Sequence, residues 1–99
     1  MRSSFPLETY NVLLSRVAQR FIDRLDGKTA TRVRKCLGCL SENPFHGRPG
    51  ADIKQLSGYC NPVFYRLRIG DYRAIYAVEG REVKVTEIMP RGKGYEWLE

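Results

Sequence analysis

Long apolar stretches are missing from this sequence. No run approaches the roughly 20 residues that a membrane-spanning helix needs. The N-terminal MRSSFPLE also lacks the apolar block of a signal peptide. Linkers, low-complexity tracts and internal repeats are absent too. The 99 residues are enough chain for one core, so we expect a single domain over residues 1–99, located in the cytoplasm.

Cysteine and histidine are scarce. The three cysteines are an odd number, which argues against a closed disulfide framework. Cys36 and Cys39 form a CxxC, but no second pair completes a zinc site, and the motif falls inside a helical pattern. His46, the one histidine, lies in a loop-like PFHGRPG segment and is a poor candidate for proton transfer. We therefore expect no metal, no cofactor and a structural role for the two thiols.

Positive charge is what the sequence has in excess. It contains 17 Lys and Arg against 11 Asp and Glu, which gives a formal net charge of +6. Such a balance favours a polyanion or an acidic protein as the partner. The charge alone does not choose between these two.

The N-terminal half predicts a strand over residues 9–14 followed by two helices. Ser15 is a candidate N-cap for the first helix, and Gly27 is expected to end it in the left-handed conformation. The second helix starts near Thr29 and ends at Asn43, because a proline follows. The first helix has an apolar stripe that consists of Val17, Ala18, Phe21 and Leu25. Another face has a row of arginines, Arg16, Arg20 and Arg24.

The C-terminal half predicts strands. A short strand is possible at residues 53–56, and FYRLRIGDYRAIYAVEG (64–80) reads as two strands joined at Gly70-Asp71. The alternating EVKVTEI (82–88) is a further strand, with Val83 and Val85 on one face. One hairpin face is apolar and should turn toward the helices; it contains Tyr65, Leu67, Ile69, Tyr72, Ala74, Tyr76 and Val78.

These elements predict an α+β fold. An N-terminal strand and a helical hairpin precede three to four antiparallel strands, and the helices pack on one face of the sheet. The other face is then left open to solvent or to a ligand.

The open face carries like charges at close quarters. A two-residue loop sets Arg68 directly opposite Arg73 and Arg66 opposite Ile75, so the three arginines share this face. Like charges opposite one another destabilise a hairpin by up to about 1 kcal/mol. A bridging phosphate would make the pair tolerable, because its oxygens can accept from both guanidinium groups. Alternatively, the arginines form a solvated face or pair with acidic side chains such as Glu87.

The sequence resembles the RelE/ParE superfamily of bacterial and archaeal toxins. The resemblance rests on KQLSG, on YRLRIGDYRAIYAV and on the ending MPRGKGY, and it covers nearly the whole chain. It implies the toxin of a type II toxin–antitoxin pair, bound by an acidic RelB-like antitoxin, with a heterotetramer as one possible assembly. RelE-type members enter the ribosomal A site and cut mRNA without a metal, whereas ParE-type members inhibit DNA gyrase.

The resemblance also implies a set of site residues. Arg68, Arg73, Arg91 and Tyr95 match the catalytic cluster, while Lys54 and Arg66 match residues that hold the RNA. RelE-type sites often have lysine at the hairpin positions. Arginine holds its proton too firmly to act as a base, so Tyr95 becomes the candidate for proton transfer.

Three alternatives remain open. Tyr95 could instead belong to an aromatic C-terminal clasp with Trp97. The chain could also be a gyrase inhibitor, or a relative that binds RNA without cutting it. Arg91 and Tyr95 favour the ribonuclease, because a gyrase inhibitor does not need them.

Overall fold

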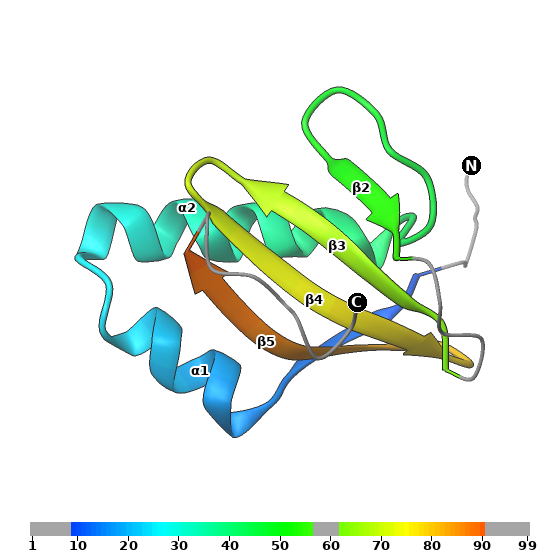
Figure 1. Ribbon diagram of the computed structural model, residues 1–99, viewed down its shortest axis with the longest axis horizontal. Helices are drawn as coiled ribbons and strands as arrows, with labels where there is room; N and C mark the ends of the chain where they lie inside the picture. Colours follow the sequence, from blue (N-terminus) through cyan, green and yellow to red (C-terminus); the bar gives the residue numbers. More distant parts are fainter. Residues whose placement is uncertain (1–8, 57–61, 91–99) are drawn as a thin grey trace, which may run out of the picture.

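The computed structural model describes residues 9–56 and 62–90, which form an α+β fold (Figure 1). The predicted fold class is confirmed. In chain order the elements are β1 (Asn11–Leu14), α1 (Arg16–Asp23), α2 (Gly27–Gly38), the 3-10 turn η1 (Cys39–Ser41), β2 (Asp52–Gln55), β3 (Phe64–Ile69), β4 (Tyr72–Glu79) and β5 (Glu82–Pro90). None of the helices in these two ranges is long and apolar enough to cross a membrane.

Ser15 connects the start of α1 to the sheet. Its side chain accepts a hydrogen bond from the backbone N–H of Ala18 at 3.0 Å, so the predicted N-cap is confirmed. Its hydroxyl also donates to the backbone oxygen of Thr86 in β5 at 2.7 Å. The cap therefore fixes the position of α1 relative to β5 as well as its first turn.

The turn between the helices differs from the prediction. Arg24 caps the end of α1 in the right-handed conformation, and Gly27 is the first residue of α2. The expected left-handed cap at Gly27 is therefore wrong. The physical reason is Asp26, whose carboxylate accepts from the backbone N–H of Thr29 at 3.0 Å and starts a new helix at once.

The sheet has the strand order β1-β5-β4-β3-β2. β1 pairs with β5 in parallel, and the remaining neighbours are antiparallel. The predicted hairpin register is confirmed, with Arg68 opposite Arg73 and Arg66 opposite Ile75. Gly70, at φ 56°, occupies the first position of the two-residue loop, where the hairpin turn requires a positive φ.

A β-bulge interrupts β5 at Thr86. Ile75 pairs with Glu87 while Tyr76 pairs with Val85, so Thr86 is the extra residue. The bulge shifts the alternation by one position. As a result Ile88 joins the core on the helix side, and Glu87 turns to the face that carries the arginines. The predicted strand 82–88 did not include this bulge.

The core lies between the helices and one face of the sheet, with α2 crossing behind the strands in Figure 1. All seven hairpin residues predicted to face the helices lie on this side: four are buried in the cluster, and Tyr65, Tyr72 and Val78 are partly buried and pack against it. In α1 the buried residues are Ala18 and Ile22, whereas Val17, predicted in the apolar stripe, is 60% exposed. The helix is therefore rotated away from the predicted stripe, so that Val17 lies at its border.

The opposite face has a smaller apolar cluster of its own. Ile75 is fully buried there together with Leu56 and Met89, and Phe64 packs against them. The face that was predicted to be open to solvent or to a ligand thus also carries an apolar cluster, which was not predicted. Two of its members lie directly opposite arginines, Ile75 opposite Arg66 and Met89 opposite Arg73.

Candidate anion-binding site on the sheet

Strand register brings the predicted cations together on one face. Asp52, Arg68 and Arg73 form one row across β2, β3 and β4, because each lies opposite the next. A second row runs from β2 to β5 and contains Lys54, Arg66, Ile75 and Glu87. Directly opposite residues share a face of a sheet. We call Lys54, Arg66, Arg68 and Arg73 the cationic face; Asp52 and Glu87 lie at its two borders.

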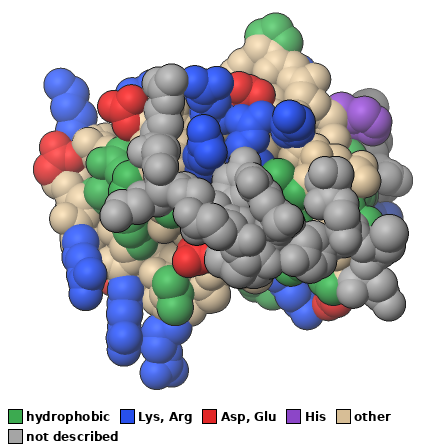
Figure 2. Space-filling view, in the orientation of Figure 1, with side chains coloured by type: hydrophobic (Ala, Val, Ile, Leu, Met, Phe, Trp, Pro, Cys, Tyr) green, Lys and Arg blue, Asp and Glu red, His purple; other side chains and the backbone are tan. Residues whose placement is uncertain are grey.

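Figure 2 shows this side of the molecule, with Lys and Arg side chains gathered over β2 and β3. The arginine side chains differ in exposure: that of Arg66 is 12% exposed and that of Arg68 is 42% exposed. The Nε atom of Arg73 is buried. Arg66 and Arg73 are therefore less exposed than Arg68 within the cationic face.

Asp52 is a site residue that the sequence analysis missed. Its Oδ1 lies 3.6 Å from Nη2 of Arg66, and its Oδ2 lies 4.0 Å from Nη1 of Arg68. The expected acidic partner was Glu87, which forms no ion pair with another described residue. The signal for Asp52 was its position two residues before Lys54, but the predicted strand began one residue too late to include it.

This arrangement can bind an anion and stabilise charge, but its arginines cannot act as bases. Guanidinium groups remain protonated at neutral pH. Burial raises the pKa of Tyr76 far above its usual value. The Tyr76 hydroxyl donates to the backbone oxygen of Pro44 at 2.7 Å on the helix side, so it takes no part in the site. Proton transfer therefore requires a group other than these arginines and Tyr76.

Arg91 and Tyr95, the remaining predicted catalytic residues, lie outside the described residues. Cys36 and Cys39 are free thiols at the end of α2 and in η1. Within residues 9–56 and 62–90, no three or more His, Cys, Asp or Glu side chains are grouped so that they could hold a metal ion. The described site therefore consists of the cationic face with Asp52.

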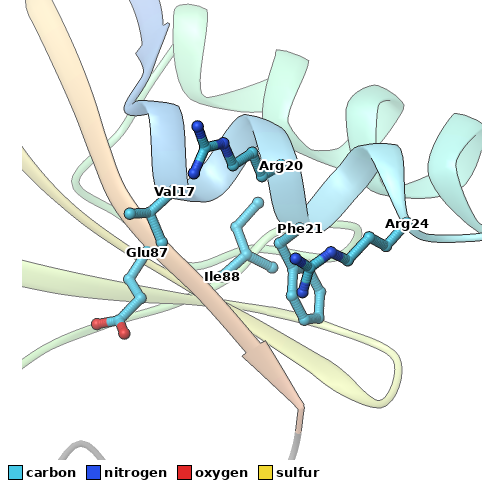
Figure 3. A pocket seen from close by; sticks show the side chains of 6 residues that line it. All are labelled: Val17, Arg20, Phe21, Arg24, Glu87 and Ile88. Atoms are coloured by element: carbon cyan, nitrogen blue, oxygen red, sulfur yellow. The ribbon is translucent and has the colours of Figure 1, made fainter.

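A second surface feature lies between α1 and β5. A groove of about 240 Å³ is lined by Val17, Phe21 and Ile88, with Arg20, Arg24 and Glu87 around it (Figure 3). Figure 3 shows the two arginines on the helix side and the Glu87 carboxylate pointing away from α1. No described carboxylate forms an ion pair with Arg20 or Arg24. The groove combines an apolar floor with unneutralised positive charge.

The comparison with protein families identifies this chain. A family model described as "ParE toxin of type II toxin-antitoxin system, parDE" matches residues 12–95, which is most of the sequence. The chain belongs to the RelE/ParE superfamily of type II toxins. The predicted family is thus confirmed, and the match includes every element of the fold except the start of β1.

The toxin is similar to several solved structures of RelE and YoeB proteins. A chain of the archaeal RelE–RelB complex from Pyrococcus horikoshii OT3 has a TM-score of 0.74 and 28% identity, covering 87% of the toxin and 99% of that chain. A chain of the toxin–antitoxin complex RelBE2 from Mycobacterium tuberculosis has a TM-score of 0.61 and 21% identity, and the match covers 84% of the toxin and 99% of that chain. A chain of the YoeB dimer from Staphylococcus aureus has a TM-score of 0.63 and 19% identity, and the match covers 82% of the toxin and 95% of that chain. The latter two likenesses support the fold alone. A search of curated proteins found no match to the toxin.

Proposed function

We propose that the toxin is a ribosome-dependent mRNA endonuclease that acts in the cytoplasm as one domain of residues 1–99 and uses no metal. In this proposal the ribose 2′-OH of mRNA in the ribosomal A site loses its proton and attacks the adjacent phosphate. The P–O5′ bond breaks, the leaving 5′-oxygen takes up a proton, and the products are a 2′,3′-cyclic phosphate and a 5′-OH end. The observation that carries the proposal is the cationic face, where Arg68 and Arg73 lie directly opposite each other. A repulsive pair at this position is suited to an anion that bridges it.

Each residue then has a role. Arg68 and Arg73 stabilise the charge that grows on the phosphorane, which is the part of such reactions where fixed cations contribute most. Lys54 and Arg66 hold the RNA backbone at the neighbouring row. On the basis of the resemblance, Arg91 adds positive charge and Tyr95 transfers a proton or orients the 2′-OH.

Single-turnover cleavage of an A-site codon on programmed ribosomes tests this function. Arg73→Ala should slow cleavage by about 100-fold or more, as loss of one oxyanion donor typically does. Arg34→Ala is a suitable control, because Arg34 pairs with Asp23 on the helices at 3.6 Å. It should cleave at the wild-type rate. Equal rates for wild type and Arg73→Ala would contradict the proposed site.

The second candidate function is inhibition of DNA gyrase without cleavage. The matching family model is that of the ParE toxin, which is the observation that favours it. Induction of the chain in cells separates the two functions. An early stop in protein synthesis with cuts inside codons supports the endonuclease, whereas DNA damage with intact messages supports the gyrase inhibitor.

We further propose that an acidic antitoxin places an amphipathic helix in the groove beside α1. Two of the similar structures are complexes of a RelE or RelBE toxin with an antitoxin. The groove is suited to such a helix: one apolar side chain would lie on Val17, Phe21 and Ile88. Carboxylates on the same helix would pair with Arg20 and Arg24. Whether the complex is a heterodimer or a heterotetramer is a separate question.

Charge reversal tests this contact. With the acidic protein encoded beside the toxin as the probe, Arg20→Glu should raise the Kd at least tenfold. Lys28→Glu, the same change in the adjacent helix α2, should alter the Kd only slightly. Equal losses in the two variants would mean that only net charge matters, and failure of the two proteins to co-purify would reject the antitoxin proposal.

A further inference from the structure

Asp52 is an acidic residue built into the cationic face. It is paired with Arg68 across β2 and β3, and its two carboxylate oxygens are divided between two guanidinium groups. One oxygen lies 3.6 Å from Arg66 and the other 4.0 Å from Arg68. Two non-bridging phosphate oxygens could be divided between the same groups in the same way. The Asp52 carboxylate therefore lies where a phosphate ligand could bind, and it has the same sign of charge.

The partners of this ion pair differ in how easily they can move. The Arg66 side chain is 12% exposed, whereas that of Asp52 is 56% exposed. Asp52 lies on β2, an edge strand of the sheet. A guanidinium with this little exposure favours a nearby counter-charge, because leaving it uncompensated is costly. A half-exposed carboxylate can turn into water when another anion arrives. Arg66 therefore stays in place while its counterion can be exchanged.

The two contacts are also loose. Both N–O distances exceed about 3.2 Å, the upper limit of a good hydrogen bond. The carboxylate therefore balances charge without hydrogen-bonding to either guanidinium group. A phosphate that approaches to hydrogen-bond distance would gain interactions that Asp52 does not make. The carboxylate is thus a weak occupant of a site suited to a stronger one.

We propose that Asp52 is an internal counterion that an RNA phosphate displaces. Because a ligand must displace this carboxylate, Asp52 sets how many negative charges the ligand needs in order to bind. The inference rests on the proposed function in taking RNA as that ligand. A single small anion competes poorly with a tethered carboxylate, because tethering gives the carboxylate a high effective concentration. A polynucleotide also reaches Lys54 and Arg73, and these extra contacts compensate for the displacement. Asp52 therefore favours chains of phosphates over isolated phosphate.

The test is binding of a labelled single-stranded RNA oligonucleotide to the purified toxin across a series of NaCl concentrations, with inorganic phosphate as competitor. Asp52→Asn should bind the oligonucleotide about threefold to tenfold more tightly at low salt. The slope of log K against log salt should steepen by up to about 0.7, which corresponds to one more neutralised phosphate on a single strand. Inorganic phosphate should compete better against this variant than against wild type.

A matched control separates this effect from net charge. Asp23→Asn removes the same charge and breaks an ion pair of the same 3.6 Å length, with Asp23 59% and Arg34 52% exposed. Its affinity for RNA should rise by much less than that of Asp52→Asn, and its sensitivity to phosphate should stay at the wild-type level. Asp52→Glu keeps the charge and should restore affinity close to wild type.

Equal gains in Asp52→Asn and Asp23→Asn would overturn the inference, and so would weaker binding by Asp52→Asn. A wild-type toxin that binds no RNA at low salt would overturn it as well. Cleavage is measured separately on programmed ribosomes. If the binding changes occur as expected but no codon is cut, the proposed endonuclease is wrong and the counterion role of Asp52 stands.

Discussion

The opposed arginines of β3 and β4 can be tested as a pair by a double-mutant cycle. Arg68→Gln, Arg73→Gln and the double variant each remove charge while keeping much of the side-chain stem. The Cβ atoms of directly opposite residues are about 5 Å apart, and charges about 6 Å apart interact by about 0.7 kcal/mol in water. Arg68 is 42% exposed, which keeps the estimate near this aqueous value. We expect a repulsive coupling of about 0.5–1 kcal/mol.

Urea unfolding of the four proteins at low and high salt measures this coupling. The Debye length falls from about 30 Å at 0.01 M to about 3 Å at 1 M, so the repulsion should nearly vanish at the higher concentration. The coupling should grow in an Asp52→Asn background, because Asp52 partly neutralises Arg68. An attractive coupling, or one that salt leaves unchanged, would refute the argument that stability is given up here for an anion site.

Four further predictions concern single residues. Tyr76→Phe should lower stability by about 1–3 kcal/mol in urea unfolding, because it leaves the Pro44 carbonyl without its buried 2.7 Å hydrogen bond. Gly70→Ala should cost about 1–2 kcal/mol, since φ is positive and the added Cβ would lie 3.2 Å from Arg32; Gly38→Ala, with open space around it, should cost nothing. The pKa of Asp26 is lowered from 3.8 by hydrogen bonds from the Thr29 side chain and backbone, so the stability gap between wild type and Asp26→Ala should be full above pH 3.8 and shrink as pH falls through the lowered value. Tyr95→Phe should slow single-turnover cleavage by about 100-fold or more, and a rate within about threefold of wild type would remove Tyr95 from the mechanism.

The hairpin of β3 and β4 was predictable because local rules determine it. Gly-Asp between two alternating runs selects a two-residue loop, and that loop alone sets Arg68 opposite Arg73. The inward face followed from the same alternation. Sequence reasoning therefore placed Arg66, Arg68 and Arg73 correctly on one face, whereas the position of Lys54 beside Arg66 was not predicted.

The features that were missed depend on contacts distant in the sequence. The bulge at Thr86 is supported by a hydrogen bond from its hydroxyl to the Ile75 carbonyl at 3.2 Å, which no local pattern reveals. The parallel pairing of β1 with β5 is likewise invisible in either strand alone. Val17 was misassigned because the tilt of α1 on β5, set by Ser15, decides which side of the apolar stripe is buried.

The pairing of β1 with β5 has a consequence for the order in which the chain folds. Ser15 and Thr86, whose hydrogen bond joins α1 to β5, are 71 positions apart. Pairing among β2, β3, β4 and β5 closes short loops. β1 pairs with β5, which is distant in the sequence, and closing such a long loop is slow. During synthesis β5 emerges last among the strands, yet it lies between β1 and β4. A nascent chain that lacks β5 cannot complete the sheet, so the fold described here forms only after β5 has been synthesised.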